Sequence, residues 1–66
     1  MSVAKIIEIS SESSKSFEDA IKTGIEKTEK SLKNVRGAWV AEQKVEVKAG
    51  QITNYRVVMR VSFVIE

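Results

Sequence analysis

The carboxy-terminal fifteen residues carry the most regular pattern in the chain. Between Ile52 and Glu66, apolar side chains occupy alternate positions, and a period of two predicts one long β-strand. The alternating residues are Tyr55, Val57, Met59, Val61, Phe63 and Ile65. At about 3.3 Å per residue this strand would extend roughly 50 Å, whereas a compact chain of this length has a radius of gyration of about 11 Å. We therefore expect a strand that its own domain cannot cover, and a protein that acts as one subunit of an assembly.

A second strand-like segment opens the chain and is followed by serines. Val3–Ile9 is rich in β-branched residues and predicts a first strand. The serines between positions 10 and 16 favour a turn and a helix start, because their hydroxyl groups bond to nearby backbone groups. Two cap pairs fit this spacing, Ser13 with Ser16 or Ser16 with Asp19. The sequence therefore predicts a helix beginning near residue 17.

The predicted helix has one apolar face, with residues at steps of three and four. These residues are Phe17, Ala20, Ile21, Gly24, Ile25, Thr28, Leu32 and Val35. Glycine in the middle of such a face costs up to about 1 kcal/mol relative to alanine, so Gly24 indicates close approach of the helix to the sheet. Asn34 is a suitable residue to end the helix.

The next strand is predicted over Val35–Lys48, with a loop formed by the following three residues. This loop length sets Gln43 opposite Val57 on the last strand. It also sets Trp39 opposite Val61. A two-residue loop would instead mix charged residues into the apolar face. The pattern thus predicts an α+β fold of order strand, helix, strand, strand, in which a three-stranded antiparallel sheet wraps around one helix.

The composition argues against several classes of function and does not indicate one class in particular. The chain has 66 residues, a size at which oligomerisation is a common source of stability. It contains no cysteine and no histidine, which argues against the usual nucleophilic and general-base chemistry, so we expect no enzyme activity. The net charge of +2 is spread over interspersed lysines and glutamates, unlike a nucleic-acid binder. No apolar segment predicts a membrane span or signal peptide, and we expect a cytoplasmic protein.

Four segments of the chain match the pattern of a known family. They are Lys5–Ile9, Ser13–Phe17, Asn34–Val35 and Tyr55–Phe63. On these segments the chain resembles the dodecins over its whole length, residues 1–66, as one domain. The resemblance implies a hollow homododecamer that binds flavin, as riboflavin or FMN, at its subunit interfaces, for storage or protection and not for catalysis.

Two positions depart from the family's pattern. The resemblance places a flavin-stacking tryptophan and a ring-binding glutamine where this chain has Gly37 and Arg56. Trp39 is expected to take over the stacking, because alternate residues of a regular strand share a face; the alternative is that it packs on the helix opposite Val61. Arg56 would donate to flavin carbonyls or a phosphate. Gly37, Trp39 and Arg56 are the candidate cofactor-binding residues. The predicted pairing sets Gly37 near Phe63 and far from Arg56, so a shared pocket would need two subunits.

Two further interpretations stay open. The chain also resembles a flavin-independent branch of the family, for which calcium is the implied ligand. Calcium takes about six to eight oxygen ligands, and the acidic candidates are Glu42 and Glu46, or Glu8, Glu12 and Glu66 gathered at symmetry axes. Ion pairing with arginine and lysine is the competing explanation for Glu42 and Glu46. The third interpretation is a structural shell with no dedicated ligand.

Overall fold

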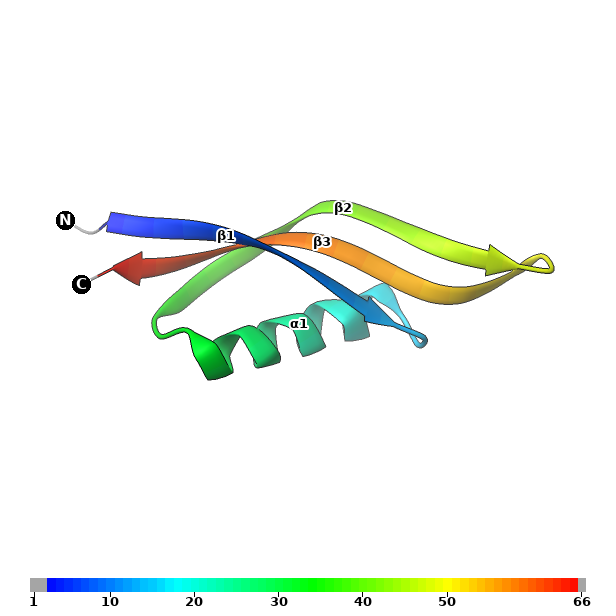
Figure 1. Ribbon diagram of the computed structural model, residues 1–66, viewed down its shortest axis with the longest axis horizontal. Coiled ribbons are helices and arrows are strands. Elements are labelled where there is room, and N and C mark those ends of the chain that lie inside the picture. The colour runs from blue at the N-terminus through cyan, green and yellow to red at the C-terminus, as the bar shows by residue number, and fades with distance from the viewer. Residues whose placement is uncertain (1–2, 66) are drawn as a thin grey trace.

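The computed structural model describes residues 3–65 (Figure 1). Within these residues the chain forms β1 (Val3–Ser13), α1 (Phe17–Ser31), β2 (Val35–Lys48) and β3 (Gln51–Ile65). The strands make an antiparallel sheet in the order β1-β3-β2, with α1 against one face (Figure 1). The predicted α+β class and element order are confirmed for this part of the chain. Glu66, predicted as the end of the last strand, lies outside the described residues.

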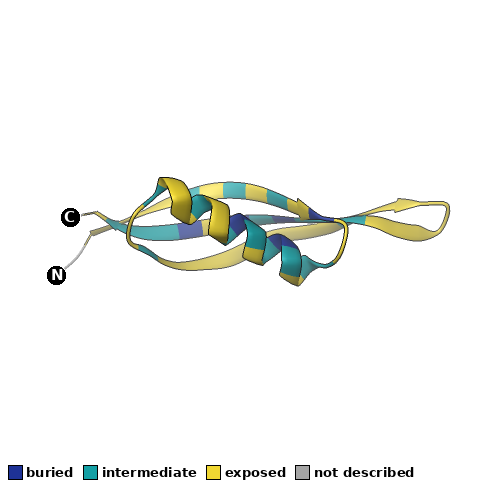
Figure 2. Ribbon diagram, turned by 90° about the horizontal axis from the view of Figure 1, so that it is seen from below, coloured by how far each residue is buried: buried dark blue, intermediate teal, exposed yellow. Residues whose placement is uncertain are grey.

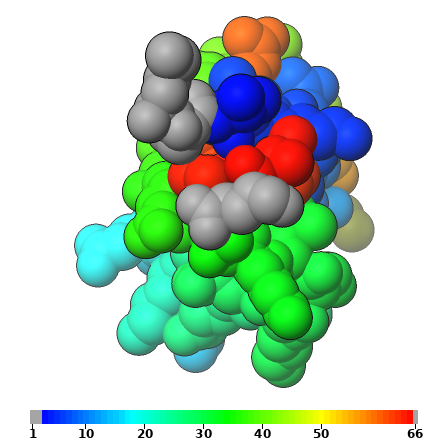
Figure 3. Space-filling view, turned by 90° about the vertical axis from the view of Figure 1, so that its left-hand side faces the viewer, coloured from blue at the N-terminus to red at the C-terminus, as the bar shows by residue number. Residues whose placement is uncertain are grey.

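The sheet is elongated, and the helix covers only part of it. The described chain measures 51 × 19 × 13 Å and has a Cα radius of gyration of 13.6 Å, larger than the roughly 11 Å of a compact chain of this length. The 15 residues of α1 extend about 22 Å, and the β2–β3 hairpin continues well past the helix (Figure 2). At the other end of the molecule, β1 and β3 lie side by side above α1 (Figure 3). Both ends of the sheet therefore extend beyond the helix.

The core lies where α1 crosses β3. Ala20 and Val57 are fully buried and Met59 is 1% exposed. A Cβ atom added at Gly24 would come within 2.8 Å of Met59 Cε and 3.0 Å of Ser11 Cβ, so the predicted close approach at this glycine is confirmed. Residues 57 and 59 of β3 point toward the helix, and because side chains alternate along a strand, residues 56, 58, 60 and 62 point away from it. We call the face of the sheet that carries these even-numbered residues of β3 the outer face.

The start of the helix follows one of the two predicted cap pairs. The Asp19 backbone N–H donates to Ser16 Oγ at 2.9 Å, so Ser16 is the N-cap. Ser13 Oγ donates to Asp19 Oδ2 at 2.7 Å and accepts from the Lys15 backbone N–H at 2.9 Å. The helix ends at Ser31, and Asn34 follows with a φ of 62°, as expected of a residue that ends a helix. No helix within residues 3–65 combines the length and the apolar character needed to span a membrane.

The first strand is longer than predicted. The end at Ile9 was wrong, because β1 continues to Ser13 and its last four residues pair with 55–58 of β3. Serine has only a weak intrinsic propensity for strands, and pairing with β3 outweighs this weak propensity here.

The predicted three-residue loop between β2 and β3 was also wrong. Lys48 pairs with Gln51 across a two-residue turn, whose residues Ala49 and Gly50 have φ values of 53° and 77°. Positive φ at both central residues matches the turn that two-residue hairpins favour. A register shift just before Val47 then restores the predicted pairing of Gln43 with Val57. The error arose because the parity argument assumed a ladder without bulges.

A second register shift changes the face on which Trp39 lies. Val40 pairs with Met59 and Glu42 with Val58, which leaves Ala41 as an additional residue. Trp39 consequently lies opposite Arg60, so its predicted pairing with Val61 was wrong. Cross-strand partners point to the same face of a sheet, which places Trp39 on the outer face. The alternative in which Trp39 packs under the helix is therefore excluded.

A third shift lies at the start of β2. Val35 pairs with Phe63, and Gly37 pairs with Ser62 where Phe63 was predicted. Gly37 therefore lies on the outer face, like Trp39.

Candidate functional site

Three side chains form a row across the middle of the outer face. Arg60 of β3 lies between Trp39 of β2 and Glu8 of β1, its partners in the two ladders. The Arg60 Nε donates to Glu8 Oε2 at 3.3 Å. Trp39 is 46% exposed, and the Arg60 and Glu8 side chains are 51% and 57% exposed. An indole, a guanidinium and a carboxylate are thus presented together on an open surface.

Gly37 provides open space next to Trp39. It lies two residues from Trp39 on the same face, and its carbonyl accepts a hydrogen bond from Ser62 Oγ at 3.3 Å. A Cβ atom added at Gly37 would meet only Ser62 Oγ, at 3.6 Å, an ordinary van der Waals distance. The backbone here would accept a larger side chain, so the glycine leaves room that is not needed for packing within the subunit.

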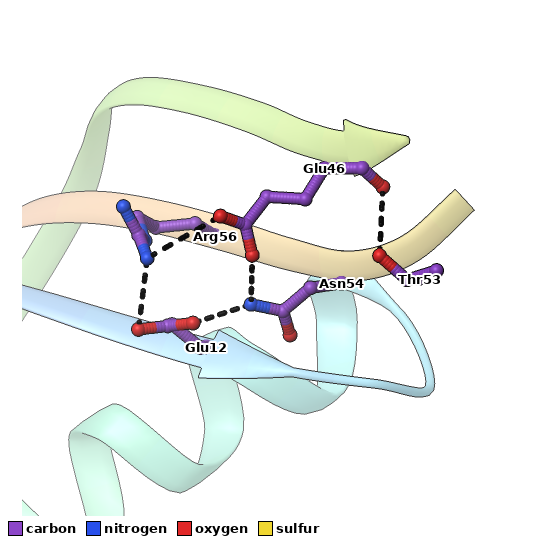
Figure 4. Close-up of polar contacts among 5 residues, drawn as sticks. All are labelled: Glu12, Glu46, Thr53, Asn54 and Arg56. Carbon is purple, nitrogen blue, oxygen red and sulfur yellow. Dashed lines mark hydrogen bonds and ion pairs between the residues drawn. The ribbon is translucent and has the colours of Figure 1, made fainter. Parts of the chain in front are cut away.

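Arg56 belongs to a separate polar cluster on the same face (Figure 4). Its Nη2 lies 3.1 Å from Glu12 Oε2 and 3.9 Å from Glu46 Oε2. Asn54 Nδ2 donates to Glu46 Oε1 at 3.0 Å and also to Glu12. We call Glu12, Glu46, Asn54 and Arg56 the Arg56 cluster. Since Glu12 lies on β1, Glu46 on β2 and the other two on β3, the cluster ties the three strands together near the hairpin.

The cluster also sets the charge state of Glu12. The hydrogen bond from Asn54 and the neighbouring Arg56 hold the pKa of Glu12 below its usual range, because both favour the charged carboxylate. Arg56 Nε is buried and has no hydrogen-bond partner among residues 3–65. Within residues 3–65, the ion pairs of the guanidinium with Glu12 and Glu46 are both made by Nη2, and its Nε donor is unpaired.

The three predicted site residues are not brought together within one subunit. Gly37 and Trp39 are neighbours, whereas Arg56 lies four residues along β3 from Arg60, about 13 Å away. A depression of about 230 Å³ adjoins Arg56 and does not include Gly37 or Trp39; it is lined by Ser10, Glu42, Gln43, Lys44, Arg56 and Val58. Arg60 was not predicted as a site residue, and Glu8 was considered only as a calcium ligand at a symmetry axis. Only the register shift at Ala41 places them beside Trp39, and no residue in the sequence marks that shift.

The acidic side chains do not form a metal site in one subunit. Within residues 3–65, no three histidine, cysteine, aspartate or glutamate side chains are arranged to hold a metal ion. Glu12 and Glu46 contact Arg56, and Glu8 contacts Arg60. Glu66, the remaining acidic candidate at the symmetry axes, lies outside the described residues.

The fold defines a class of small α+β subunits of strand, helix, strand, strand order, in which one helix covers part of a long antiparallel sheet. The sequence model of the dodecin family matches residues 3–66, and the chain belongs to this family. The family and fold are those of a small-ligand binding or storage protein that self-associates.

Solved structures of the family share the fold closely. A dodecin from Streptomyces davaonensis is 26% identical, with a TM-score of 0.91 over 98% of this chain and 96% of that chain. A Thermus thermophilus dodecin variant is 26% identical, with a TM-score of 0.93 over 100% and 98%. A calcium dodecin from Mycobacterium tuberculosis, described as having a novel calcium-binding site, is 34% identical, with a TM-score of 0.82 over 97% and 91%. A search of curated proteins finds no match.

Proposed function

We propose that this protein is a non-enzymatic flavin-binding or storage protein that assembles as a homododecamer and holds riboflavin or FMN at its subunit interfaces. The observation that carries the proposal is the position of Trp39, half-exposed on the outer face beside the open space at Gly37. An indole in this position offers a flat surface to a planar ring. Such a stack contributes about 0.5 to 1.5 kcal/mol beyond the area that it buries.

Gly37 and Arg56 have different parts in this proposal. Gly37 leaves the space into which the ligand ring extends alongside Trp39. Arg56 contacts the ligand only where a neighbouring copy brings its cluster toward Trp39, since the two are far apart in one subunit. Ion pairs to Glu12 and Glu46 keep Arg56 in a fixed orientation for that contact.

Fluorescence titration tests the flavin proposal. An indole stacked on the flavin ring quenches its emission, so we expect the assembled protein to quench added riboflavin strongly. Trp39→Ala should abolish the quenching and leave the assembly intact, whereas the matched variant Trp39→Phe should retain part of the affinity because it retains a flat ring. Unchanged riboflavin emission with the wild-type protein would contradict the proposal. Dissociation of the oligomer by Trp39→Ala without loss of bound ligand would show that this side chain serves packing between subunits.

A second candidate function is calcium binding without flavin. The 34% identity to the Mycobacterium tuberculosis calcium dodecin favours it. Melting with and without CaCl₂ tests this candidate, because a ligand at a hundred times its dissociation constant stabilises the folded state by about 2.7 kcal/mol. MgCl₂ at the same ionic strength is the control. A midpoint that responds to calcium and not to riboflavin would favour this candidate, and one that responds to neither would favour a structural shell.

A further inference from the structure

Arg60 and Glu8 lie in one row with Trp39, and the family resemblance gives neither of them a role in flavin binding. We propose that these two side chains recognise the edge of the ring that stacks on Trp39, and that they select a flat aromatic ligand with a carbonyl oxygen next to a ring N–H. This inference rests on the proposed stacking of a flavin-type ring at Trp39. It assigns the edge recognition to Arg60 and Glu8 instead of Arg56.

The spacing of the row suits a fused aromatic ring. Adjacent strands lie about 4.8 Å apart, so the row from Trp39 across Arg60 to Glu8 spans about 10 Å. All three residues lie on the outer face because they are register partners on neighbouring strands. A fused ring that begins over the indole and extends across the sheet therefore reaches the guanidinium and then the carboxylate.

The chemistry of the pair is complementary to one kind of ring edge. Arginine is only a donor, and ionised glutamate is only an acceptor. Among residues 3–65, the hydrogen bond and ion pair of Arg60 both join its Nε to Glu8, which leaves the outer nitrogens of the guanidinium for a ligand carbonyl. Glu8 has a second carboxylate oxygen for a ligand N–H. A carbonyl beside an N–H is present on the dione ring of a flavin.

Arg56 is less suited to this role. It lies about 13 Å along β3 from Arg60, and two carboxylates of its own subunit already hold its guanidinium. Its side chain is 30% exposed, against 51% for Arg60. A ligand would have to displace existing ion pairs to use Arg56, whereas Arg60 offers free donors next to the indole.

The test compares ligands and variants through the emission of Trp39, the only tryptophan of the chain. For the wild-type assembly, riboflavin methylated on the imide nitrogen should bind about tenfold more weakly than riboflavin, since it cannot donate to Glu8. Arg60→Gln should weaken riboflavin by a similar factor. Arg56→Gln should weaken riboflavin less than Arg60→Gln does, and the control Lys22→Gln, at an exposed position of α1 away from the outer face, should change the affinity by less than about twofold.

The outcomes separate this inference from the proposed function. Equal affinity for riboflavin and its methylated form would overturn it, and that comparison needs only the wild-type protein. A larger loss in Arg56→Gln than in Arg60→Gln would also overturn it. In either case riboflavin binding that still requires Trp39 would leave the proposed function standing. Absence of riboflavin binding by the wild-type protein would instead remove the proposed function, and this inference with it.

Discussion

Glu12 shows how neighbouring side chains fix the state of an exposed residue on the outer face. Its pKa is lowered first by the hydrogen bond from Asn54 and then by Arg56. A carboxylate with a lowered pKa stabilises the folded state at pH values above its unfolded pKa. This stabilisation is lost as the pH falls through the lower, folded-state pKa. The Arg56 cluster should therefore loosen only in acid, below the usual titration range of glutamate.

Removing the amide of Asn54 tests this account. We expect Asn54→Ala to raise the pKa of Glu12 toward its usual value, because the largest cause of the lowering is gone. The measurement is an NMR titration of the Glu12 carboxyl carbon. Thr53→Ala is a suitable control, since within residues 3–65 the Thr53 hydroxyl donates to the main-chain oxygen of Glu46 and not to a carboxylate. If Thr53→Ala shifted the titration midpoint of Glu12 and Asn54→Ala left it unchanged, the assigned cause would be wrong.

Trp39 marks the limit of what single residues in the sequence could predict. Its identity as the only indole was evident, and so was its spacing of two from Gly37. The face of the sheet on which Trp39 lies could not be predicted, because it depends on the register shift at Ala41. Alanine has no feature that marks a bulge, and one additional residue turns every later side chain to the other face. The position of Arg60 and Glu8 beside Trp39 could not be predicted for the same reason.

The helix and the strands themselves were predictable because local patterns in the sequence mark them. Ser16 as the cap, the apolar face from Phe17 and the alternation of β3 are local patterns, and local patterns are present in the sequence. Where an element ends is decided by pairing between distant segments, as in the extension of β1 to Ser13. The element order and the start of the helix were therefore predicted correctly, whereas the strand end, the hairpin turn and the bulges were not.

Gly24 gives the contact between α1 and the sheet a quantitative test. Alanine is favoured over glycine in a helix by up to about 1 kcal/mol. The added methyl group would however press on the buried Met59 and on Ser11, at 2.8 and 3.0 Å, and overpacking of this kind costs about 1 to 3 kcal/mol. The clash should prevail, so Gly24→Ala is expected to lower the free energy of unfolding by about 1 kcal/mol. Urea denaturation at fixed protein concentration measures the change.

A solvent-exposed position on the same helix provides the comparison. Lys22→Ala should change stability by less than about 0.5 kcal/mol, because the side chain is exposed. If Gly24→Ala proved more stable than the wild type, helix propensity would outweigh packing at this position. The helix and the sheet would then be able to move apart to accommodate the added methyl group.

At the scale of the whole molecule, the ends of the sheet are the surfaces that the subunit leaves uncovered. Val47 and Ile52 pair with each other at the hairpin end and are 62% and 50% exposed. Val3, Ile6 and Ile65 lie toward the opposite end and are 50% to 65% exposed. The sheet extends past α1 at both ends (Figure 2). Exposed apolar groups of this size at two ends are typical of a surface that other copies cover.

Charge at the hairpin end tests whether neighbouring copies bury it. Full burial of an aliphatic side chain of this size contributes about 1.5 to 3 kcal/mol, and a buried, unpaired lysine is strongly unfavourable. We therefore expect the double variant Val47→Lys with Ile52→Lys to lose the proposed dodecamer in sedimentation velocity at micromolar concentration. Gln51→Lys, which adds a charge at the neighbouring exposed turn, should assemble like the wild type. If the double variant assembled equally well, the hairpin end would lie outside the interfaces, and the other end of the sheet would be the surface that neighbouring copies bury.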